Sequence, residues 1–153
     1  MSDKERTFLE RVSLLITELK APKSQRNNFG KYNYRSAEDI LEAVKPLAYK
    51  YGLVAKLSDE PVMIGDWHYI KATASIKDVK TGEEEIATAY AREPLAKKGM
   101  DESQITGTAS SYARKYAMNG LYQIDDTKDA DTDEYTEQVK WLFRTARLES
   151  DCT

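Results

Sequence analysis

The chain has very few of the residues from which catalytic and metal centres are usually built. Its 153 residues include one cysteine, Cys152, and one histidine, His68. A single cysteine excludes a disulfide within the chain and favours a cytoplasmic location, and one Cys with one His cannot supply a tetrahedral Cys/His zinc site. A lone histidine on an expected strand is usually structural or exposed, so His68 is not expected to be catalytic.

Long apolar runs and phosphate-binding glycine motifs are also missing. No apolar stretch reaches the roughly 18 residues that a membrane span needs, and the N-terminal residues lack the apolar core of a signal peptide. The sequence contains neither a Walker A loop nor a dinucleotide-binding glycine fingerprint. These absences favour a protein that uses no ATP or cofactor and has no membrane partner.

Carboxylates are dense in one segment, residues 125–133. Alternating aspartates begin many calcium loops, but the central glycine and the final glutamate of such a loop are absent here. We therefore interpret the segment as a solvated acidic linker and expect no bound metal. The alternative is a metal-dependent nuclease that uses these carboxylates.

Charge is distributed unevenly along the chain, whose formal net charge is −3. Between residues 20 and 56, eight basic residues stand against three acids, a balance of +5. Residues 125–137 hold seven acids and one lysine, a balance of −6. The overall charge argues weakly against a nucleic-acid partner, but the basic front half favours one because distribution matters more than the sum.

The first fifty residues show helical spacing interrupted by a polar segment. Hydrophobic residues make up 41% of the chain and charged residues 32%, as in a folded domain with a solvated surface. The spacing predicts a helix over residues 4–19 and a second that starts at a capping box of Ser36 and Asp39 and carries Pro46 inside it. Residues 20–34 are expected to form a loop or hairpin tip.

After Gly52 the hydrophobic period changes to two. Residues 53–64, 67–79 and 83–92 read as strands, and the turn signals between them are Gly65-Asp66 and Thr81-Gly82. Three strands joined by two short turns predict an antiparallel meander. One face of such a sheet can pack against helices while the other meets solvent or a partner.

A loop over residues 94–100 leads to a third predicted helix, which Asp101 or Ser103 would cap and Gly120 would end. Its expected packing stripe consists of Ile105, Ala109, Tyr112, Ala113 and Tyr116. The predicted fold class is α+β: a three-stranded antiparallel meander packed with helices, as a β-β-β-α core preceded by two helices. Residues 1–124 would form the DNA-binding domain, and residues 125–153 an acidic linker with a short tail.

Two segments carry residues suited to single-stranded nucleic acid. In the first, Tyr32 and Tyr34 alternate with Lys31 and Arg35. Cations follow phosphates, and aromatic rings stack on unpaired bases with about 1–3 kcal/mol per base and little sequence preference. It is equally open that the tyrosines belong to the core of a short strand and that the cations are merely solvated.

The second segment is the third helix. Thr106, Ser110 and Arg114 recur every four residues and so form one ridge, two hydroxyls and a guanidinium. Such groups suit phosphate oxygens. The alternative interpretation is ordinary packing of the helix against the sheet.

Together, the two segments resemble the ERF family of bacteriophage single-strand annealing proteins (recombinases). The resemblance covers about residues 5–130, and it implies a cytoplasmic, phage-encoded recombinase that forms rings or filaments. It also implies a β-β-β-α core like that of the eukaryotic strand-annealing mediators. The motifs that carry it are Lys31 to Ser36, Gly107 to Tyr116, Asn119-Gly120-Leu121 and Asp125-Asp126.

The resemblance further implies where DNA binds. In the relatives the helix after the hairpins lines a basic groove, but Ser110 and Ser111 stand where more basic relatives have cations. We therefore expect cations elsewhere in the chain to supply more of the positive charge of the DNA groove. The candidate DNA-binding residues are Lys31, Tyr32, Tyr34, Arg35, Arg92, Lys97, Lys98, Thr106, Ser110, Ser111, Arg114 and Lys115.

We therefore expect a homo-oligomer that binds single-stranded DNA and anneals complementary strands in phage homologous recombination, without ATP or covalent chemistry. Its expected partners are single-stranded DNA, further copies of the chain and, as a further candidate, a host single-strand-binding protein. Two alternatives stay open at this point: a passive single-strand-binding module without annealing activity, and the metal-dependent nuclease.

Overall fold

The computed structural model describes residues 5–93 and 99–124. Within them lie three helices and two antiparallel sheets, and this confirms the predicted α+β class. Residues 94–98, with Lys97 and Lys98, and the acidic segment from residue 125 lie outside the described residues. The elements are α1 (Phe8–Glu18), β1 (Gln25–Asn27), β2 (Tyr32–Tyr34), α2 (Ala37–Lys50), β3 (Leu53–Ile64), β4 (Trp67–Asp78), β5 (Glu84–Arg92) and α3 (Glu102–Tyr122).

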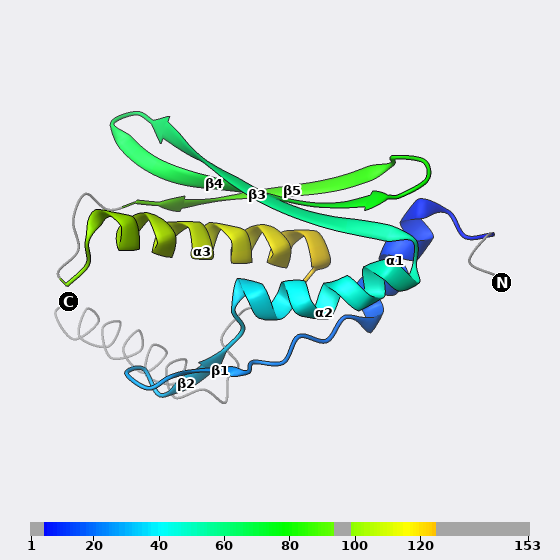
Figure 1. Cartoon of the computed structure of the whole chain (residues 1–153), viewed down its shortest axis with the longest axis horizontal. Helices are drawn as coiled ribbons and strands as arrows, with labels where there is room; N and C mark the ends of the chain where they lie inside the picture. Colours follow the sequence, from blue (N-terminus) through cyan, green and yellow to red (C-terminus); the bar gives the residue numbers. More distant parts are fainter. Residues whose placement is uncertain (1–4, 94–98, 125–153) are drawn as a thin grey trace, which may run out of the picture.

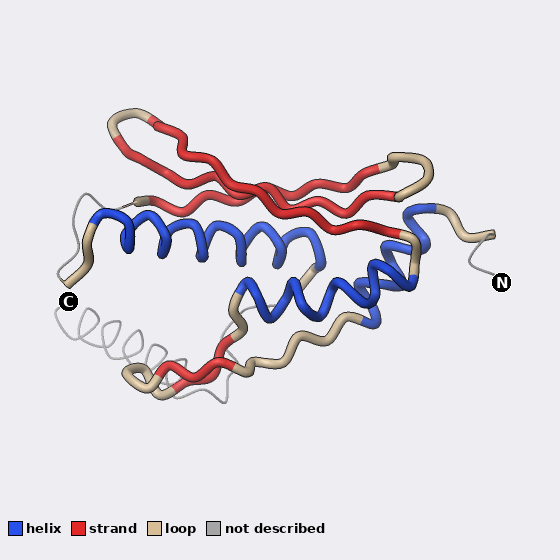
Figure 2. The backbone as a smooth tube through the Cα atoms, viewed as in Figure 1, coloured by secondary structure: helices blue, strands red, loops and turns tan. Residues whose placement is uncertain are grey.

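The larger sheet is the predicted meander, with strand order β3-β4-β5. Its register pairs Ile64 with Trp67 across the first turn and Tyr69 with Arg92 in the second hairpin. Helices α2 and α3 lie on the same side of this sheet, and no described helix covers the opposite face (Figure 1). A small β1-β2 hairpin, drawn below α3 in Figure 2, separates α1 from α2 in the chain.

The core lies between the sheet and the helices. Alternation in β4 turns Ile70, Ala72, Ala74 and Ile76 toward the helices, and all four side chains are buried, as the sequence pattern predicts. On α3 the buried positions are mostly small, and they include Ala109, Ala113 and Ala117. Small side chains let the helix backbone approach the sheet closely, so α3 can pack along the alanine-rich helix-facing side of β5.

The predicted capping box of α2 is confirmed. The Asp39 amide donates to Ser36 Oγ at 3.1 Å, and the Ser36 amide donates to Asp39 Oδ2 at 2.9 Å. The predicted start of the first helix at residue 4 is wrong. Thr7 caps α1, because its hydroxyl accepts a hydrogen bond from the Glu10 amide at 3.2 Å and so satisfies one of the free amides of the first turn.

Two predictions for α3 are wrong. Gly120 does not end the helix, which continues to Tyr122 because Leu121 and Tyr122 are buried and extend the packed face. Gln123, in the left-handed conformation at φ 56°, is the C-cap instead. Tyr112 and Tyr116, placed in the packing stripe, are 51% and 49% exposed.

A buried ion pair fastens α1 to the end of the sheet. Arg11 donates from Nη1 to the Tyr51 carbonyl at 2.7 Å, and its Nη2 pairs with the Asp78 carboxylate. Asp78 also accepts from the amides of Lys80 and Thr81 at 2.8 and 3.2 Å. These hydrogen bonds lower the pKa of Asp78 to about 2, and the one from Arg11 has the largest effect.

Candidate nucleic-acid interface

The β1-β2 hairpin lies in the most basic segment of the described chain. Residues 20–35 contain five lysines and arginines and no acid. At the tip, Asn27 Oδ1 accepts from the amides of Phe29 and Gly30 at 3.0 and 2.9 Å, and Lys31 takes the left-handed conformation at φ 55°. This turn fully exposes the Phe29 ring. Cations and an exposed ring therefore share one small, defined loop.

Lys115 joins this hairpin to α3. Its Nζ lies 5.8 Å from the centroid of the Tyr34 ring on β2, a cation–π contact. Ser111, one turn earlier on α3, is exposed and lies on the same side of the helix as Lys115. Two segments that the sequence singled out, about 80 residues apart in the chain, thus meet. We call Phe29, Lys31, Tyr34, Ser111 and Lys115 the hairpin–α3 face.

Arg35 and Tyr32 lie beside this face. The Arg35 Nε donates to the Ala21 carbonyl at 2.5 Å, so the half-buried Arg35 side chain holds the segment that follows α1. The Tyr32 main chain pairs with Asn27 in the hairpin. Arg35 therefore has a structural contact in addition to its predicted role at phosphates.

The predicted ridge of α3 exists, and it faces acids of the sheet. Thr106 donates to the carboxylate of Glu93, and Ser110 donates to that of Asp59. Arg114 Nε lies 3.3 Å from Asp59 Oδ2. A phosphate at Arg114 would have to compete with Asp59.

A hollow of about 660 Å³ beside the ridge has the same acidic character. A nucleic-acid backbone is repelled by such a lining. Within residues 5–93 and 99–124, no group of three or more His, Cys, Asp or Glu side chains is arranged to hold a metal ion. The acids of the helix side that line the hollow are Asp59, Glu93 and Glu102, and Glu60 lies at the rim, since the register turns it to the opposite side of β3.

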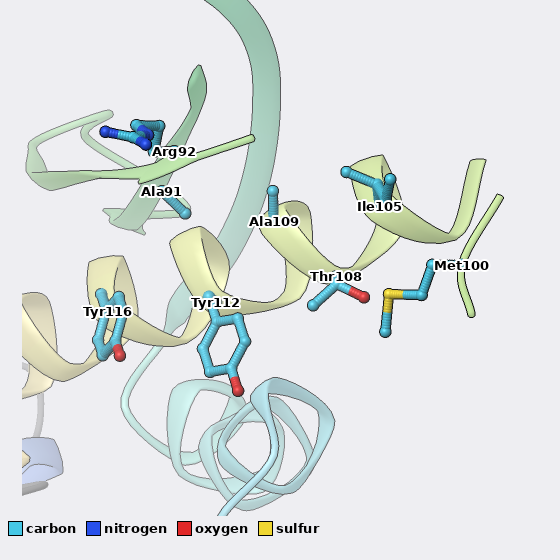
Figure 3. Close-up of a pocket in the computed structure, with 8 residues that line it drawn as sticks. All are labelled: Ala91, Arg92, Met100, Ile105, Thr108, Ala109, Tyr112 and Tyr116. Atoms are coloured by element: carbon cyan, nitrogen blue, oxygen red, sulfur yellow. The ribbon is translucent and has the colours of Figure 1, made fainter. Parts of the chain in front are cut away.

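Arg92 is separated from the other candidate residues. In Figure 3 its side chain projects from β5 to the side opposite Ala91, which points toward α3. The Arg92 guanidinium lies 3.8 Å from the centroid of the Trp67 ring, on the face of the sheet that no described helix covers. The candidate residues thus divide between the two faces of the sheet.

Tyr112 and Tyr116 were missed as surface residues. Their rings are stacked, with centroids 6.1 Å apart and planes at 22°, and both project from α3 beside a hollow of about 490 Å³ under β5 (Figure 3). A signal in the sequence could have found them: the alanines at 109, 113 and 117 recur every fourth residue and already supply a packing face.

In the described part of the chain no helix is both long and apolar enough to span a membrane. His68 is exposed on β4.

Comparison with known proteins gives two matches. Residues 8–141 match the family model described as the ERF superfamily. The chain is 56% identical over 131 residues to the "Essential recombination function protein" of Salmonella phage P22, and the match covers 86% of this chain and 62% of that relative. The chain thus spans less than two thirds of the relative's length. No solved structure matches significantly.

Proposed function

The chain belongs to the ERF superfamily, and on that premise we propose that it binds single-stranded DNA and anneals complementary strands in phage homologous recombination. The name of the P22 relative supports the role in recombination. The resemblance of the sequence motifs to annealing proteins supports the activity. The hairpin–α3 face is the proposed contact with the strand.

The observation that carries this proposal is the meeting of Lys115 and Tyr34. It places an α3 cation against the hairpin of the segment 20–35, which contains five cations and no acid. Cations at this density favour the phosphate backbone, and the exposed Phe29 ring offers a flat face to an unstacked base. Both contacts are independent of base sequence, as annealing of arbitrary complementary strands requires.

Annealing needs positioning and charge neutralisation rather than bond chemistry. Two strands repel each other through their phosphates, and each also folds on itself. A protein that neutralises phosphates and holds a strand extended, with its pairing edges outward, lowers both barriers. Base pairing then supplies the free energy, so the proposed annealing needs neither nucleotide hydrolysis nor a metal. In this proposal the protein acts without covalent chemistry, in the cytoplasm of the host.

Self-association is part of the proposal. One protomer offers only a few contacts to a strand, and repetition of the same face in a ring or filament would raise the affinity through effective concentration. Among the described strands, β3 and β5 each pair only with β4. Their outer edges therefore carry unpaired backbone groups that another protomer can satisfy.

Mixing two complementary labelled oligonucleotides with and without the protein tests the function. We expect faster duplex formation without ATP or metal, together with closed rings or filaments in electron micrographs. A passive single-strand coat would slow duplex formation or leave it unchanged. Degradation of labelled DNA with magnesium or manganese would instead support the nuclease alternative.

A further inference from the structure

The sheet face opposite the helices, here called the open face, carries its own set of rings and cations. The β4-β5 register places Trp67, Tyr69 and Lys71 of β4 on the same side as Tyr90 and Arg92 of β5. No described helix covers this side (Figure 1). Trp67 is 44% exposed and Tyr90 is 47% exposed, so both rings are accessible to a ligand.

These side chains form an ordered platform. The Arg92 guanidinium lies 3.8 Å from the centroid of the Trp67 ring. Next to it, Tyr69 and Tyr90 meet edge to face, with ring centroids 6.5 Å apart and planes at 85°. Lys71 is directly opposite Tyr90 in the register. Side chains that contact one another lose less conformational freedom when a ligand binds, so the platform is partly preorganised.

We propose that the open face is a second binding surface for single-stranded nucleic acid, with Tyr90 and the Trp67–Arg92 pair as stacking elements and Arg92 and Lys71 as phosphate contacts. Unpaired bases stack on aromatic rings and on Arg guanidinium planes. Strand-binding surfaces without sequence preference combine such rings with cations.

The charge balance of the open face favours a phosphate backbone. Four cations and two acids lie on this side of the three strands by alternation in the register, a balance of +2. Lysine is depleted at the centres of protein interfaces, whereas interspersed lysine and arginine suit a phosphate backbone. The cations are Lys56, Lys71, Lys77 and Arg92, and the acids are Glu60 and Glu84.

The inference goes beyond the proposed function because it gives each protomer two strand-binding surfaces on opposite sides of one sheet. The hairpin–α3 face lies on the helix side, and the open face lies on the other side (Figure 1). A protein that brings two strands together benefits from holding both of them. Loss of one surface should leave the other functional, so the two proposals can fail separately.

Tryptophan fluorescence provides a direct test, because the chain has only two tryptophans. In a Trp141→Phe protein, Trp67 is the only tryptophan, and titration with oligo(dT) should quench the fluorescence of Trp67 under excitation selective for tryptophan. The quenching should persist when Lys115→Ala is added, because Lys115 lies on the other side of the sheet. Photocrosslinking of a bromodeoxyuridine-substituted oligo(dT), read by mass spectrometry, should then identify Trp67 or Tyr90.

Three variants measure the contribution of the platform, each checked for folding by its thermal melt. Arg92→Ala and Tyr90→Ala should each weaken binding to the open face by about tenfold, measured in the Lys115→Ala background. Arg92→Lys keeps the charge but loses the planar group, so it should recover only part of the loss. Lys80→Ala is the control: it removes one exposed cation from the turn between β4 and β5, outside the platform, and should leave binding unchanged.

Several results would overturn the inference. One is unquenched Trp67 emission in a protein that still binds oligo(dT), which would leave the hairpin–α3 proposal intact. Absence of all oligo(dT) binding would remove both proposals. If Trp67→Ala reduces the assembly mass in light scattering and leaves DNA binding per protomer unchanged, the open face is an interface between copies of the chain.

Discussion

Replacement of Asp78 by Asn should destabilise the fold and also change how its stability depends on pH. Asn keeps a side-chain carbonyl that can accept from the amides of Lys80 and Thr81, but it cannot pair as a charge with Arg11. In the parent protein the Asp78 side chain is only 3% exposed and the Arg11 side chain 13% exposed. Removal of one partner from a buried pair costs about 3–5 kcal/mol, because the remaining charge is left uncompensated.

The acid limb of the stability profile follows from the pKa of Asp78. Folding lowers this pKa from 3.8 to about 2, and at 1.36 kcal/mol per pKa unit the difference corresponds to about 2 kcal/mol. Because the folded pKa is the lower one, this contribution is fully present above about pH 5. It is lost as the pH falls toward 2 and the carboxylate becomes protonated in the folded state.

Urea denaturation followed by circular dichroism, at intervals from pH 2 to pH 7, measures both effects. The difference in unfolding free energy between the parent and Asp78→Asn should be constant above about pH 5 and should shrink by about 2 kcal/mol between pH 4 and pH 2. Other carboxylates titrate in both proteins and cancel in the difference. Parallel profiles over the whole range would refute the assignment of a lowered pKa to Asp78.

Other predictions follow from single features of the structure. Gly120→Ala should raise the unfolding free energy by about 0.5–1 kcal/mol, since the added Cβ would lie at an ordinary 3.8 Å from Ala87 Cβ. Gly52→Ala should lower the unfolding free energy by about 1 kcal/mol or more, because φ at Gly52 is +68°. Thermal melts of the two variants test both expectations. Phe29→Ala should weaken oligo(dT) binding by about 1–3 kcal/mol in fluorescence anisotropy, with an unchanged melting temperature because the ring is fully exposed; equal affinity would argue against stacking. Residues 125–137 carry a local charge of −6, and we expect them to compete with DNA for the basic residues. Removal of the chain after Asp129 should therefore raise DNA affinity, mostly at low salt, where screening is weakest. Unchanged or weaker binding there would contradict this competition.

Local signals in the sequence predicted the elements well. Turn residues and a period of two placed the three strands to within one residue, because the antiparallel register follows from short turns. The Ser36 cap depends only on neighbouring residues, and it too was confirmed. The errors on α3 came from long-range packing: buried Leu121 and Tyr122 carry the helix past Gly120, and the alanines leave Tyr112 outside the core.

The candidate site was harder to predict because its partners are distant in the sequence. The ridge of Thr106, Ser110 and Arg114 looked like a phosphate site from its spacing, but only the folded chain brings Asp59 and Glu93 against it. Likewise, Arg92 reaches the Trp67 ring through the β4-β5 register rather than through any local motif.

The salt dependence of single-strand binding tests the role of the hairpin–α3 face most directly. For oligo(dT) and for a mixed-sequence strand, Lys115→Ala should weaken binding about equally and should flatten the slope of log affinity against log salt by about 0.7 for one lost phosphate contact. Arg114→Ala should leave that slope nearly unchanged, because Asp59 already holds the guanidinium. A folded Lys115→Ala protein with the parent's affinity and slope, or a flattened slope in Arg114→Ala alone, would contradict the account.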